Sequence, residues 1–310
     1  MSERIVVTGG AGYVGSVLVP HLLAQGYRVH VVDNLRFGGE GLLGNFIHPS
    51  FTFAVADVTD AAAMKRELAG ADAVVHLATL VGYPACKKWP DEARATNVQG
   101  TQNVLDALRP ETKLINFSTG SNYGEVMGVC DEDTPLNPLS LYGETKTEAE
   151  ARCMKRPNTV ALRFATAFGL SPRLRLDLMI NDFTYQALVN RYLLVYERRF
   201  RRTFIHVRDM ARVVPHLLRN WDAARDRVFN VGQETMNYTK EDIVRLLQSK
   251  MDFHLHFADV GTDEDKRDYE VSYARIRGIG FSTEVDIHKG MDELIRGLRV
   301  VRIRNPYSNV

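Results

Sequence analysis

The sequence predicts an α/β fold: a doubly wound parallel sheet with a smaller mixed α/β lobe. Apolar, β-branched runs alternate with helical patterns through the first half of the chain. A glycine series directly follows the first of these runs, and the alternation stops after Phe168-Gly169. Such alternation is typical of parallel strands joined by right-handed helical crossovers, with helices on both faces of the sheet.

Each expected element follows from the period of its apolar residues. We expect strands at Ile5–Thr8, Arg28–Asp33, Phe51–Ala56, Ala73–Leu77, Lys113–Ser118 and Thr159–Phe164, and a last strand at Val228–Gly232 that returns to the main sheet. We expect helices at about 13–25, 61–69, 91–108 and 141–155, another beginning within 173–183, and two more at about 239–249 and 284–299.

The composition is that of an ordinary globular protein. The chain has 310 residues, of which 45% are hydrophobic and 25% charged, with a net charge of +1. Near-neutrality gives no reason to expect a nucleic-acid partner, and no stretch reaches the roughly 18 apolar residues of a membrane span. The first strand begins without a preceding signal peptide, so we expect a cytoplasmic protein. Cys86, Cys130 and Cys153 lack metal-ligand spacing, which predicts reduced thiols and no metal site.

The glycine series after the first strand has the context of a dinucleotide-binding turn, because a strand precedes it and a helix follows it. Gly9 would permit the tight turn, Gly12 would let the backbone approach a pyrophosphate, and Gly15 would let the helix lie close to the strand. The helix N-terminus would then face the anion. The alternative is a glycine-rich turn without a ligand.

Asp33 ends the second strand, where a carboxylate can accept hydrogen bonds from both hydroxyls of an adenosine ribose. A carboxylate repels a 2′-phosphate, so Asp33 favours NAD over NADP, although the nearby Arg36 could reverse this preference. Asp33 could also serve only as a cap. Asp57, at the end of the third strand, is a candidate for the adenine edge, with a turn as the alternative.

The fourth strand ends in His76-Leu77-Ala78-Thr79, where small residues let the backbone pass close to a cofactor. We interpret His76 as a buried, hydrogen-bonded histidine. The loop from Leu80 to Pro90 is a candidate cover for the substrate. Asn97 lies in the middle of the next helical pattern, where an amide is locally unfavourable and indicates a packing or functional reason.

Tyr142 and Lys146 are four residues apart and therefore share one helix face. The phenol of tyrosine titrates near 10, and an adjacent ammonium lowers that pKa toward the range of a useful base. Thr119, at the end of a strand, could hydrogen-bond the same substrate oxygen. A surface pair is the alternative, but the glycine turn and Asp33 favour a catalytic one.

The combination of these motifs resembles the extended short-chain dehydrogenases/reductases, and within them the NAD-dependent sugar-nucleotide epimerases and dehydratases such as UDP-glucose 4-epimerase. The resemblance covers nearly the whole chain, including a Rossmann-type domain. It is carried by Thr8–Gly15, Asp33-Asn34-Leu35, Asp57-Val58, His76-Leu77-Ala78, Asn97, Ser118-Thr119 and Tyr142-Gly143-Glu144-Thr145-Lys146.

The resemblance implies a role for each matched residue. Tyr142 would be the base, Lys146 its partner and a ligand of the nicotinamide ribose, and Thr119 the third catalytic residue. The expected NAD contacts are Gly9, Gly12, Tyr13, Val14, Gly15, Asp33, Asn34, Asp57, Val58, Leu77, Ala78, Thr79, Asn97 and Lys146.

The resemblance also narrows the reaction. Dehydratases of the family carry Thr-Asp-Glu where this chain has Thr119-Gly120-Ser121, and the decarboxylases usually carry Glu in place of Ser121. A 4-epimerase needs no extra carboxylate, so we expect a 4-epimerase of a nucleoside-diphosphate sugar, of the UDP-hexose or UDP-hexuronate type. A 4-keto-sugar reductase, or a decarboxylase or dehydratase on the same triad, is the alternative enzyme. An NAD-sensing binding protein is the alternative of another class.

Expected substrate contacts come from both halves of the chain. The segment around Arg202 is similar to a family motif whose arginine binds the diphosphate, and Arg267 is similar to a second such arginine; arginine suits a diphosphate because its donors are forked and permanently charged. A solvated basic face is the alternative. Thr166 and Asp177 stand where relatives often have asparagine, and Asn181 could replace Asp177. The full expected set is Thr119, Ser121, Asn122, Tyr142, Thr166, Asn181, Arg202 and Arg267.

These assignments divide the chain into two parts. Residues 1–168 would form the NAD-binding Rossmann domain, with 203–232 returning to it, and residues 169–202 and 233–310 would form the substrate-binding lobe. Relatives pair through helices, so we expect a homodimer through helices 91–108 and 141–155. The tail from Arg302 to Val310 is expected to be an exposed extension.

Overall fold

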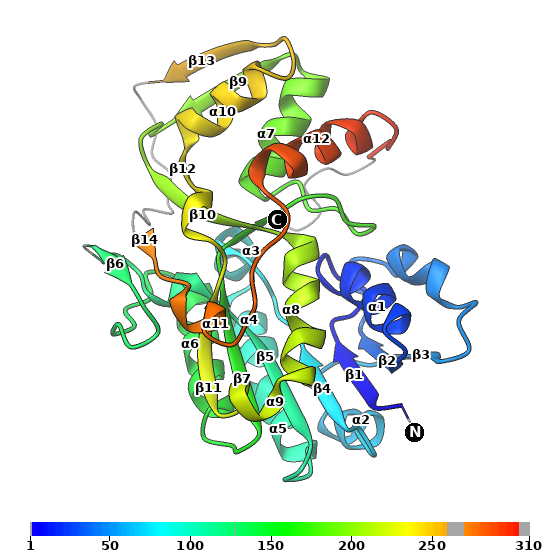
Figure 1. Ribbon diagram of the computed structural model, residues 1–310. Coiled ribbons are helices and arrows are strands. Elements are labelled where there is room, and N and C mark those ends of the chain that lie inside the picture. Colours follow the sequence, from blue (N-terminus) through cyan, green and yellow to red (C-terminus); the bar gives the residue numbers. More distant parts are fainter. Residues whose placement is uncertain (1, 127, 259–269, 304–310) are drawn as a thin grey trace.

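Seven parallel strands form the centre of the computed structural model, which describes residues 2–126, 128–258 and 270–303 (Figure 1). Their order across the sheet is β11-β7-β5-β4-β1-β2-β3, and every neighbouring pair is parallel. The predicted α/β fold with a doubly wound sheet is therefore confirmed. The strands are β1 (Arg4–Thr8), β2 (Arg28–Asp33), β3 (Phe51–Val55), β4 (Ala73–His76), β5 (Lys113–Thr119), β7 (Thr159–Phe164) and β11 (Arg227–Val231).

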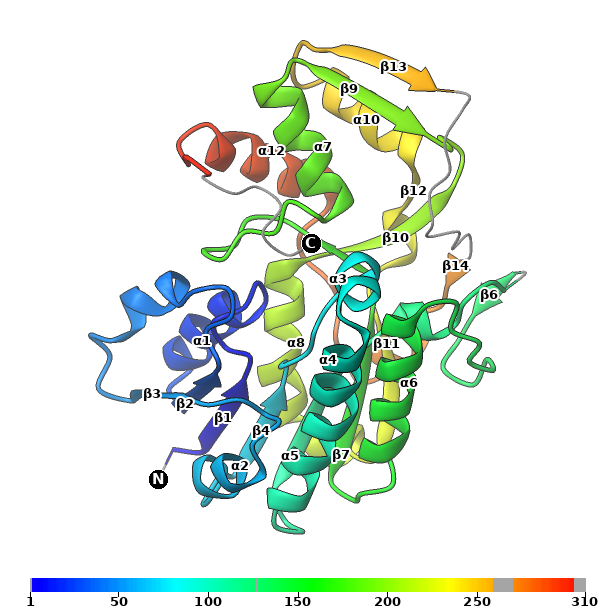
Figure 2. The same cartoon turned by 180° about the vertical axis from the view of Figure 1, so that it is seen from behind.

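Helices cover both faces of this sheet, because successive side chains of a strand point to opposite faces. Ile5 and Val7 of β1 pack in one core with helices α1 and α8, whereas Val6 packs in another with α2, α5 and α6. Figures 1 and 2 show these two helical layers. The helices are α1 (Gly15–Ala24), α2 (Ala61–Glu67), α5 (Thr101–Ala107), α6 (Leu141–Cys153) and α8 (Val207–Arg219).

The helix expected at 91–108 is interrupted. It consists of α4 (Pro90–Arg94), a π-helical turn η2 (Ala95–Gly100) and then α5. The loop expected from Leu80 to Pro90 contains a further short helix, α3 (Tyr83–Lys88).

A smaller lobe lies beyond the carboxyl ends of the strands and has its own apolar core (Figure 2). A three-stranded sheet in the order β12-β10-β8 connects it to the main domain, and a two-stranded sheet, β13-β9, lies at its outer end. Thr203–His206 therefore belongs to this small sheet rather than to the main one. The elements are β8 (Thr166–Phe168), α7 (Met179–Val189), β9 (Tyr192–Tyr196), β10 (Arg201–His206), β12 (Asn237–Thr239), α10 (Lys240–Gln248), β13 (His254–Ala258) and α12 (Ile287–Leu298).

The remaining described segments are short. β6 (Val129–Cys130) pairs with β14 (Glu270–Val271), and the 3-10 turns are η1 (Glu40–Asn45), η3 (Gly120–Asn122) and η4 (Glu234–Met236). Two short helices are α9 (Trp221–Ala224) and α11 (Ala274–Arg277). Within the described ranges, no helix is both long and apolar enough to span a membrane. All three cysteines are buried free thiols.

Candidate functional site

A cleft of about 740 Å³ lies at the carboxyl ends of the parallel strands, between the main domain and the smaller lobe. This is where open α/β sheets bind ligands, and the volume is within the usual range for a small-molecule site. Most of the predicted site residues line it: Gly9, Gly12, Tyr13, Val14, Gly15, Asp33, Asn34, Asp57, Val58, Leu77, Ala78, Thr79, Thr119, Ser121, Tyr142, Thr166 and Arg202.

The glycine turn between β1 and α1 fits tightly against its neighbours. Gly9 has a φ of +74°, and a Cβ added there would lie 2.6 Å from the backbone nitrogen of Ala78. A Cβ at Gly15 would lie 2.4 Å from the Gly10 carbonyl oxygen. Val14, which precedes α1, supplies no capping side chain, so the start of the helix faces the cleft without a side-chain acceptor. This cradle fits a cofactor pyrophosphate.

Acidic side chains stand at the ends of β2 and β3, beside the glycine turn. The Asp33 carboxylate accepts hydrogen bonds from the Ala11 nitrogen (3.0 Å) and the Leu35 nitrogen (2.8 Å). Burial raises the pKa of Asp33, against the effect of these two bonds. The Asp57 carboxylate accepts a bond from the Asn34 amide (2.7 Å). Both carboxylates line the cleft, which is the arrangement expected for an adenosine ribose and its base.

Asn97 holds the loop after β4 without lining the cleft. Its side-chain oxygen accepts bonds from the Thr79 hydroxyl and the Leu80 nitrogen, both at 2.7 Å. Its amide nitrogen donates to the Leu80 carbonyl (3.1 Å) and to the Thr145 hydroxyl on α6 (3.0 Å). The mid-helix amide thus has a packing role, in which it joins the cofactor-side loop to the helix that carries Tyr142.

His76 is buried under the same loop. Its ring nitrogens lie 2.7 Å from the Thr8 hydroxyl and 3.0 Å from the Thr101 hydroxyl. Burial, with a smaller effect from Lys146, lowers the pKa of His76 to about 3. The interpretation of His76 as a neutral, hydrogen-bonded core residue is confirmed.

Thr119 and Tyr142 line the cleft from two elements. Thr119 ends β5, and its hydroxyl accepts a bond from the Ser121 nitrogen and donates to the Ser121 hydroxyl, both at 3.1 Å. Tyr142 lies in the first turn of α6, whose N-cap is Ser140. Ser140 accepts a bond from the Gly143 nitrogen at 3.2 Å, which fixes the start of the helix.

Lys146 follows Tyr142 by one helical turn and is only 2% exposed. Burial lowers the pKa of Lys146 to about 8, against the effect of Cys153 and Glu150. Lys146 does not itself line the cleft, so its pairing with Tyr142 stays a prediction.

Arg175 is a cation in the cleft that the motif analysis did not identify. Its Nε and Nη2 donate to the two carboxylate oxygens of Asp177, at 3.1 and 2.5 Å. Burial opposes the charge of Arg175, but Asp177 and the nearby Tyr142 raise the pKa of Arg175 overall. The loop between β8 and α7 therefore brings a cation within electrostatic range of Tyr142. Asp177 has its own cationic partner, and no sequence motif signalled this pair.

Two amides expected to contact substrate are instead fully buried and do not line the cleft. The Asn122 amide donates to the Ser118 hydroxyl (3.0 Å) and to Glu150 (3.1 Å). The Asn181 oxygen accepts a bond from the Gly169 nitrogen, and its amide donates to the Arg175 carbonyl, both at 2.9 Å. Asn181 thus shapes the loop that presents Arg175. Arg267 lies outside the described residues.

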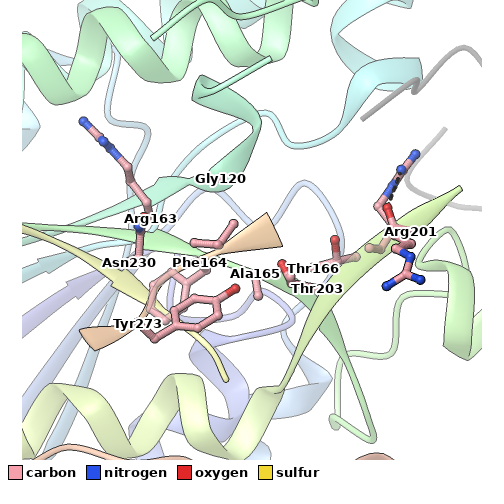
Figure 3. A pocket seen from close by; sticks show the side chains of 11 residues that line it. Gly120, Arg163, Phe164, Ala165, Thr166, Arg201, Thr203, Asn230 and Tyr273 are labelled. Carbon is pink, nitrogen blue, oxygen red and sulfur yellow. Dashed lines mark hydrogen bonds between the residues drawn. The ribbon is translucent and has the colours of Figure 1, made fainter. Parts of the chain in front are cut away.

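A small side pocket of about 20 Å³ adjoins the cleft and shares Phe164, Ala165, Thr166 and Arg202 with it. In Figure 3, the Tyr273 ring lies beside Phe164 and Ala165, and Arg201 lies on the other side of the pocket near Thr203. This volume admits about one water molecule. Arg202 is 7% exposed, belongs to β10 and lines the cleft, so the smaller lobe presents a largely buried cation to it.

The loop after β8 is attached to the glycine turn. The Tyr13 hydroxyl donates to the Gly169 carbonyl (2.7 Å), and the Ser171 hydroxyl donates to the Tyr13 carbonyl (2.7 Å). These two bonds therefore join the glycine turn to the loop that leads into the smaller lobe. No group of three or more metal-ligating side chains occurs among the residues with described positions.

Comparison with known proteins agrees with this geometry. Residues 5–232 match the model of the "NAD dependent epimerase/dehydratase family". UDP-glucuronic acid decarboxylase 2 of Arabidopsis thaliana is 30% identical over 313 residues, which cover 96% of this chain and 68% of that protein. The low-salt glycan biosynthesis protein Agl12 of Haloferax volcanii is 29% identical, with 94% of this chain and 97% of that protein covered.

Solved structures share the fold over almost the entire chain. A UDP-glucuronic acid 4-epimerase from Bacillus cereus, in complex with UDP-glucuronic acid and NAD, superposes with a TM-score of 0.84 at 25% identity, covering 96% of this chain and 99% of that one. A UDP-glucose 4-epimerase from Thermotoga maritima, with UDP-glucose, gives 0.83 at 25% identity, covering 96% and 98%. The glycine cradle, the paired acids and the family match together lead to one conclusion: the chain belongs to the NAD-dependent epimerase/dehydratase family and is an NAD-dependent enzyme that modifies sugar nucleotides.

Proposed function

We propose that the protein is a 4-epimerase of a nucleoside-diphosphate sugar, of the UDP-hexose or UDP-hexuronate type. The observation that carries the proposal is the composition of the cleft beside Tyr142. Thr119 and Ser121 line it, and neither Gly120 nor Ser121 supplies the carboxyl group that elimination or assisted decarboxylation would use. Epimerisation at C4 needs only a base, a hydrogen-bonding hydroxyl and a retained cofactor.

The proposed chemistry assigns one role to each side chain. Bound NAD supplies a hydride acceptor that later returns the hydride to C4. Tyr142 takes the proton from the sugar O4 and gives it back after the 4-keto ring has turned over. The Lys146 ammonium, one helical turn from Tyr142, would favour the phenolate form of the base, and Arg175, which interacts electrostatically with Tyr142, would add to this effect. The Thr119 hydroxyl hydrogen-bonds the same oxygen and keeps it in line.

The smaller lobe would bind the diphosphate. Arg202 is the candidate donor, because it belongs to β10 of the smaller lobe and lines the cleft. Thr166, Ser121 and Thr119 would contact the sugar. The buried amides of Asn122 and Asn181 would act indirectly, through Ser118 and through the loop at Gly169 and Arg175.

A direct test incubates the purified protein with UDP-glucose, UDP-galactose, UDP-glucuronate and UDP-galacturonate, without added cofactor or reductant. The proposal expects interconversion of one 4-epimeric pair, with NAD found by mass spectrometry in the denatured protein. Formation of a UDP-pentose would instead support a decarboxylase, in line with the Arabidopsis relative. A protein that turns over none of these four sugars, but reduces a UDP-4-keto sugar with a stoichiometric nicotinamide reductant, would be a 4-keto-sugar reductase. NAD binding without any sugar turnover would support a sensor. Each of these three results contradicts the epimerase.

Replacing the base tests the assignment of Tyr142. We expect Tyr142→Phe to lower kcat about 10²- to 10⁴-fold, because the phenol that exchanges the O4 proton is lost while the ring stays. NAD content and thermal stability should remain near the wild-type values. Tyr27→Phe, outside the cleft, is the matched control. A Tyr142→Phe variant with the wild-type kcat would show that another group moves the proton.

We also propose a homodimer through α4, α5 and α6, the helices within the ranges 91–108 and 141–155. These helices lie side by side on one face of the sheet (Figure 2). Light scattering of the purified protein measures the mass directly, and a monomer at micromolar concentration would contradict this assembly.

A further inference from the structure

Four side chains from three separate segments form an alternating stack of aromatic rings and guanidinium groups. The Arg36 guanidinium lies 4.8 Å from the centre of the Trp89 ring and 5.7 Å from that of Phe37. The Arg173 guanidinium lies 4.6 Å from the centre of the Phe37 ring. We call Arg36, Phe37, Trp89 and Arg173 the clasp.

The clasp connects parts of the chain that are distant in sequence. Arg36 and Phe37 follow β2, Trp89 joins α3 to α4, and Arg173 lies between β8 and α7. Arg36 also forms an ion pair with Glu92 of α4. The stack and the ion pair therefore hold three loops together that no regular secondary structure joins.

The clasp lies at the adenosine end of the cleft. Arg36, Phe37, Glu92 and Arg173 line the same cleft as Asp33 and Asp57. Arg36 contributes to the lowered pKa of Asp57, and Arg173 has an electrostatic interaction with Asp33. These two acids end β2 and β3, so the stack stands beside the position expected for the adenosine.

We propose that the clasp retains the cofactor: it closes over the adenosine half of bound NAD and limits the rate at which NAD leaves. Release would require Arg36 to separate from Trp89 and Glu92, because these contacts join the segment after β2 to the start of α4, and Arg36 and Glu92 both line the cleft. The Arg36 guanidinium is already paired with the Glu92 carboxylate. For this reason, the closeness of Arg36 to Asp33 does not indicate a preference for a 2′-phosphate. The proposal depends on NAD binding in the cleft and goes beyond the 4-epimerase assignment.

Exchange of isotopically labelled NAD tests this role without any sugar nucleotide. The full-length protein is loaded with unlabelled NAD and mixed with excess labelled NAD, and the bound fraction is followed by mass spectrometry. We expect Trp89→Leu to accelerate exchange about tenfold, as the loss of one such contact predicts, and Arg36→Ala to accelerate it at least as much, because it also removes the contact with Phe37 and the ion pair with Glu92. Arg225→Ala, which breaks an exposed ion pair with Asp222 outside the cleft, should exchange at the wild-type rate.

Exchanging the two charges of the Arg36–Glu92 pair distinguishes a loss of the clasp from a general loss of folding as the cause of faster NAD exchange. Arg36→Glu should accelerate exchange more than Arg36→Ala does, and the double variant Arg36→Glu/Glu92→Arg should recover part of the loss, because the ion pair between the two segments is restored while the stack on Trp89 is not. Wild-type exchange rates in Arg36→Ala or Trp89→Leu, or no recovery in the double variant, would overturn the clasp. A protein that exchanges NAD as expected but does not epimerise sugars would overturn the proposed reaction alone.

Discussion

The Arg163 guanidinium and the Glu150 carboxylate form a buried ion pair one helical turn beyond Lys146. Their side chains are 6% and 5% exposed, and Arg163 Nε and Nη2 both donate to Glu150. Arg163 Nη1 also donates to the Tyr123 hydroxyl (3.0 Å), which donates to the Asn230 side chain (2.7 Å). Because the charges are matched and hydrogen-bonded, this network anchors β7 to α6, the helix that carries Tyr142.

Replacing only Arg163 should lower the free energy of unfolding far more than replacing Arg163 and Glu150 together. We expect Arg163→Met to lower the free energy of unfolding by about 3–5 kcal/mol, because Glu150 stays buried without its cation. The double variant Arg163→Met/Glu150→Leu should recover much of that loss. Arg152→Met, which breaks the more exposed pair with Glu148, should change stability by less than about 1 kcal/mol. Urea unfolding measures all three, and equal losses in the single and double variants would contradict a dominant charge effect.

At the scale of elements, the interrupted helix α4–η2–α5 is the feature that joins packing to the site. A π-helical turn often marks a functional position, because it displaces side chains from their regular faces. Here it brings Asn97 to Thr79, Leu80 and Thr145. It also brings Gly100 against Val58, where an added Cβ would lie 2.6 Å from Val58 Cγ2. The π-helical turn thus explains why both Asn97 and Gly100 occur in the middle of a helical segment.

The π-helical turn predicts a coupled defect when Asn97 is replaced. Asn97→Ala leaves the backbone groups of Leu80 without their side-chain partner, so we expect a loss of stability of about 1–3 kcal/mol. The affinity for NAD should fall as well, because the loop from Leu77 to Leu80 lines the cleft. Asp106→Ala, at an exposed position of α5 whose side chain accepts a bond from Gln102, is the control and should change neither quantity appreciably. Calorimetric titration with NAD and thermal unfolding give the two readouts, and wild-type NAD affinity in Asn97→Ala would show that the loop is held by other contacts.

At the scale of the whole molecule, two buried imidazoles connect stability to pH. Burial lowers the pKa of His76, in the main sheet, and of His206, where β10 meets α8, from 6.5 to about 3. In the unfolded chain both titrate near 6.5, so between about pH 6.5 and 3 the unfolded state binds more protons than the folded state. Stability therefore falls as the pH drops through this window.

The expected slope is about 1 kcal/mol per pH unit for each histidine within this window. We expect His76→Gln to be less stable than the wild type at pH 7, because the contacts with Thr8 and Thr101 are altered, but to lose less stability between pH 6.5 and 4. Melting temperatures across this range measure the difference. Parallel curves for the two proteins would show that His76 does not carry the predicted proton linkage.

The sequence predicted those parts of the fold and site that depend on local pattern. The strands of the main sheet follow from short apolar runs, and the glycine turn follows from residues without a side chain. Asp33 was recognised as a carboxylate at the end of a strand. The strands of the smaller lobe were harder to predict, because β8 and β12 are only three residues long and are stabilised by pairing with β10. Short runs of this kind carry no usable period.

The direction in which a side chain points was the other feature of the site that could not be predicted from the sequence. Asn122 and Asn181 lie within segments that approach the substrate region, yet tertiary contacts turn both amides into the protein interior. Arg175 carries no motif of its own, and it reaches Tyr142 only because the Tyr13 and Asn181 contacts shape its loop. Contacts between residues so far apart in sequence cannot be inferred from spacing.

The strand order has a consequence for synthesis of the chain. β7 takes its outer neighbour from β11, which the ribosome makes only after the segment that includes α7, β9, β10 and α8. Until then, the edge of β7 is an open template for pairing with another nascent chain. We therefore expect an incomplete polypeptide that ends before Arg227 to depend on chaperones, and a ribosome stalled there to yield aggregates rather than an independent N-terminal domain.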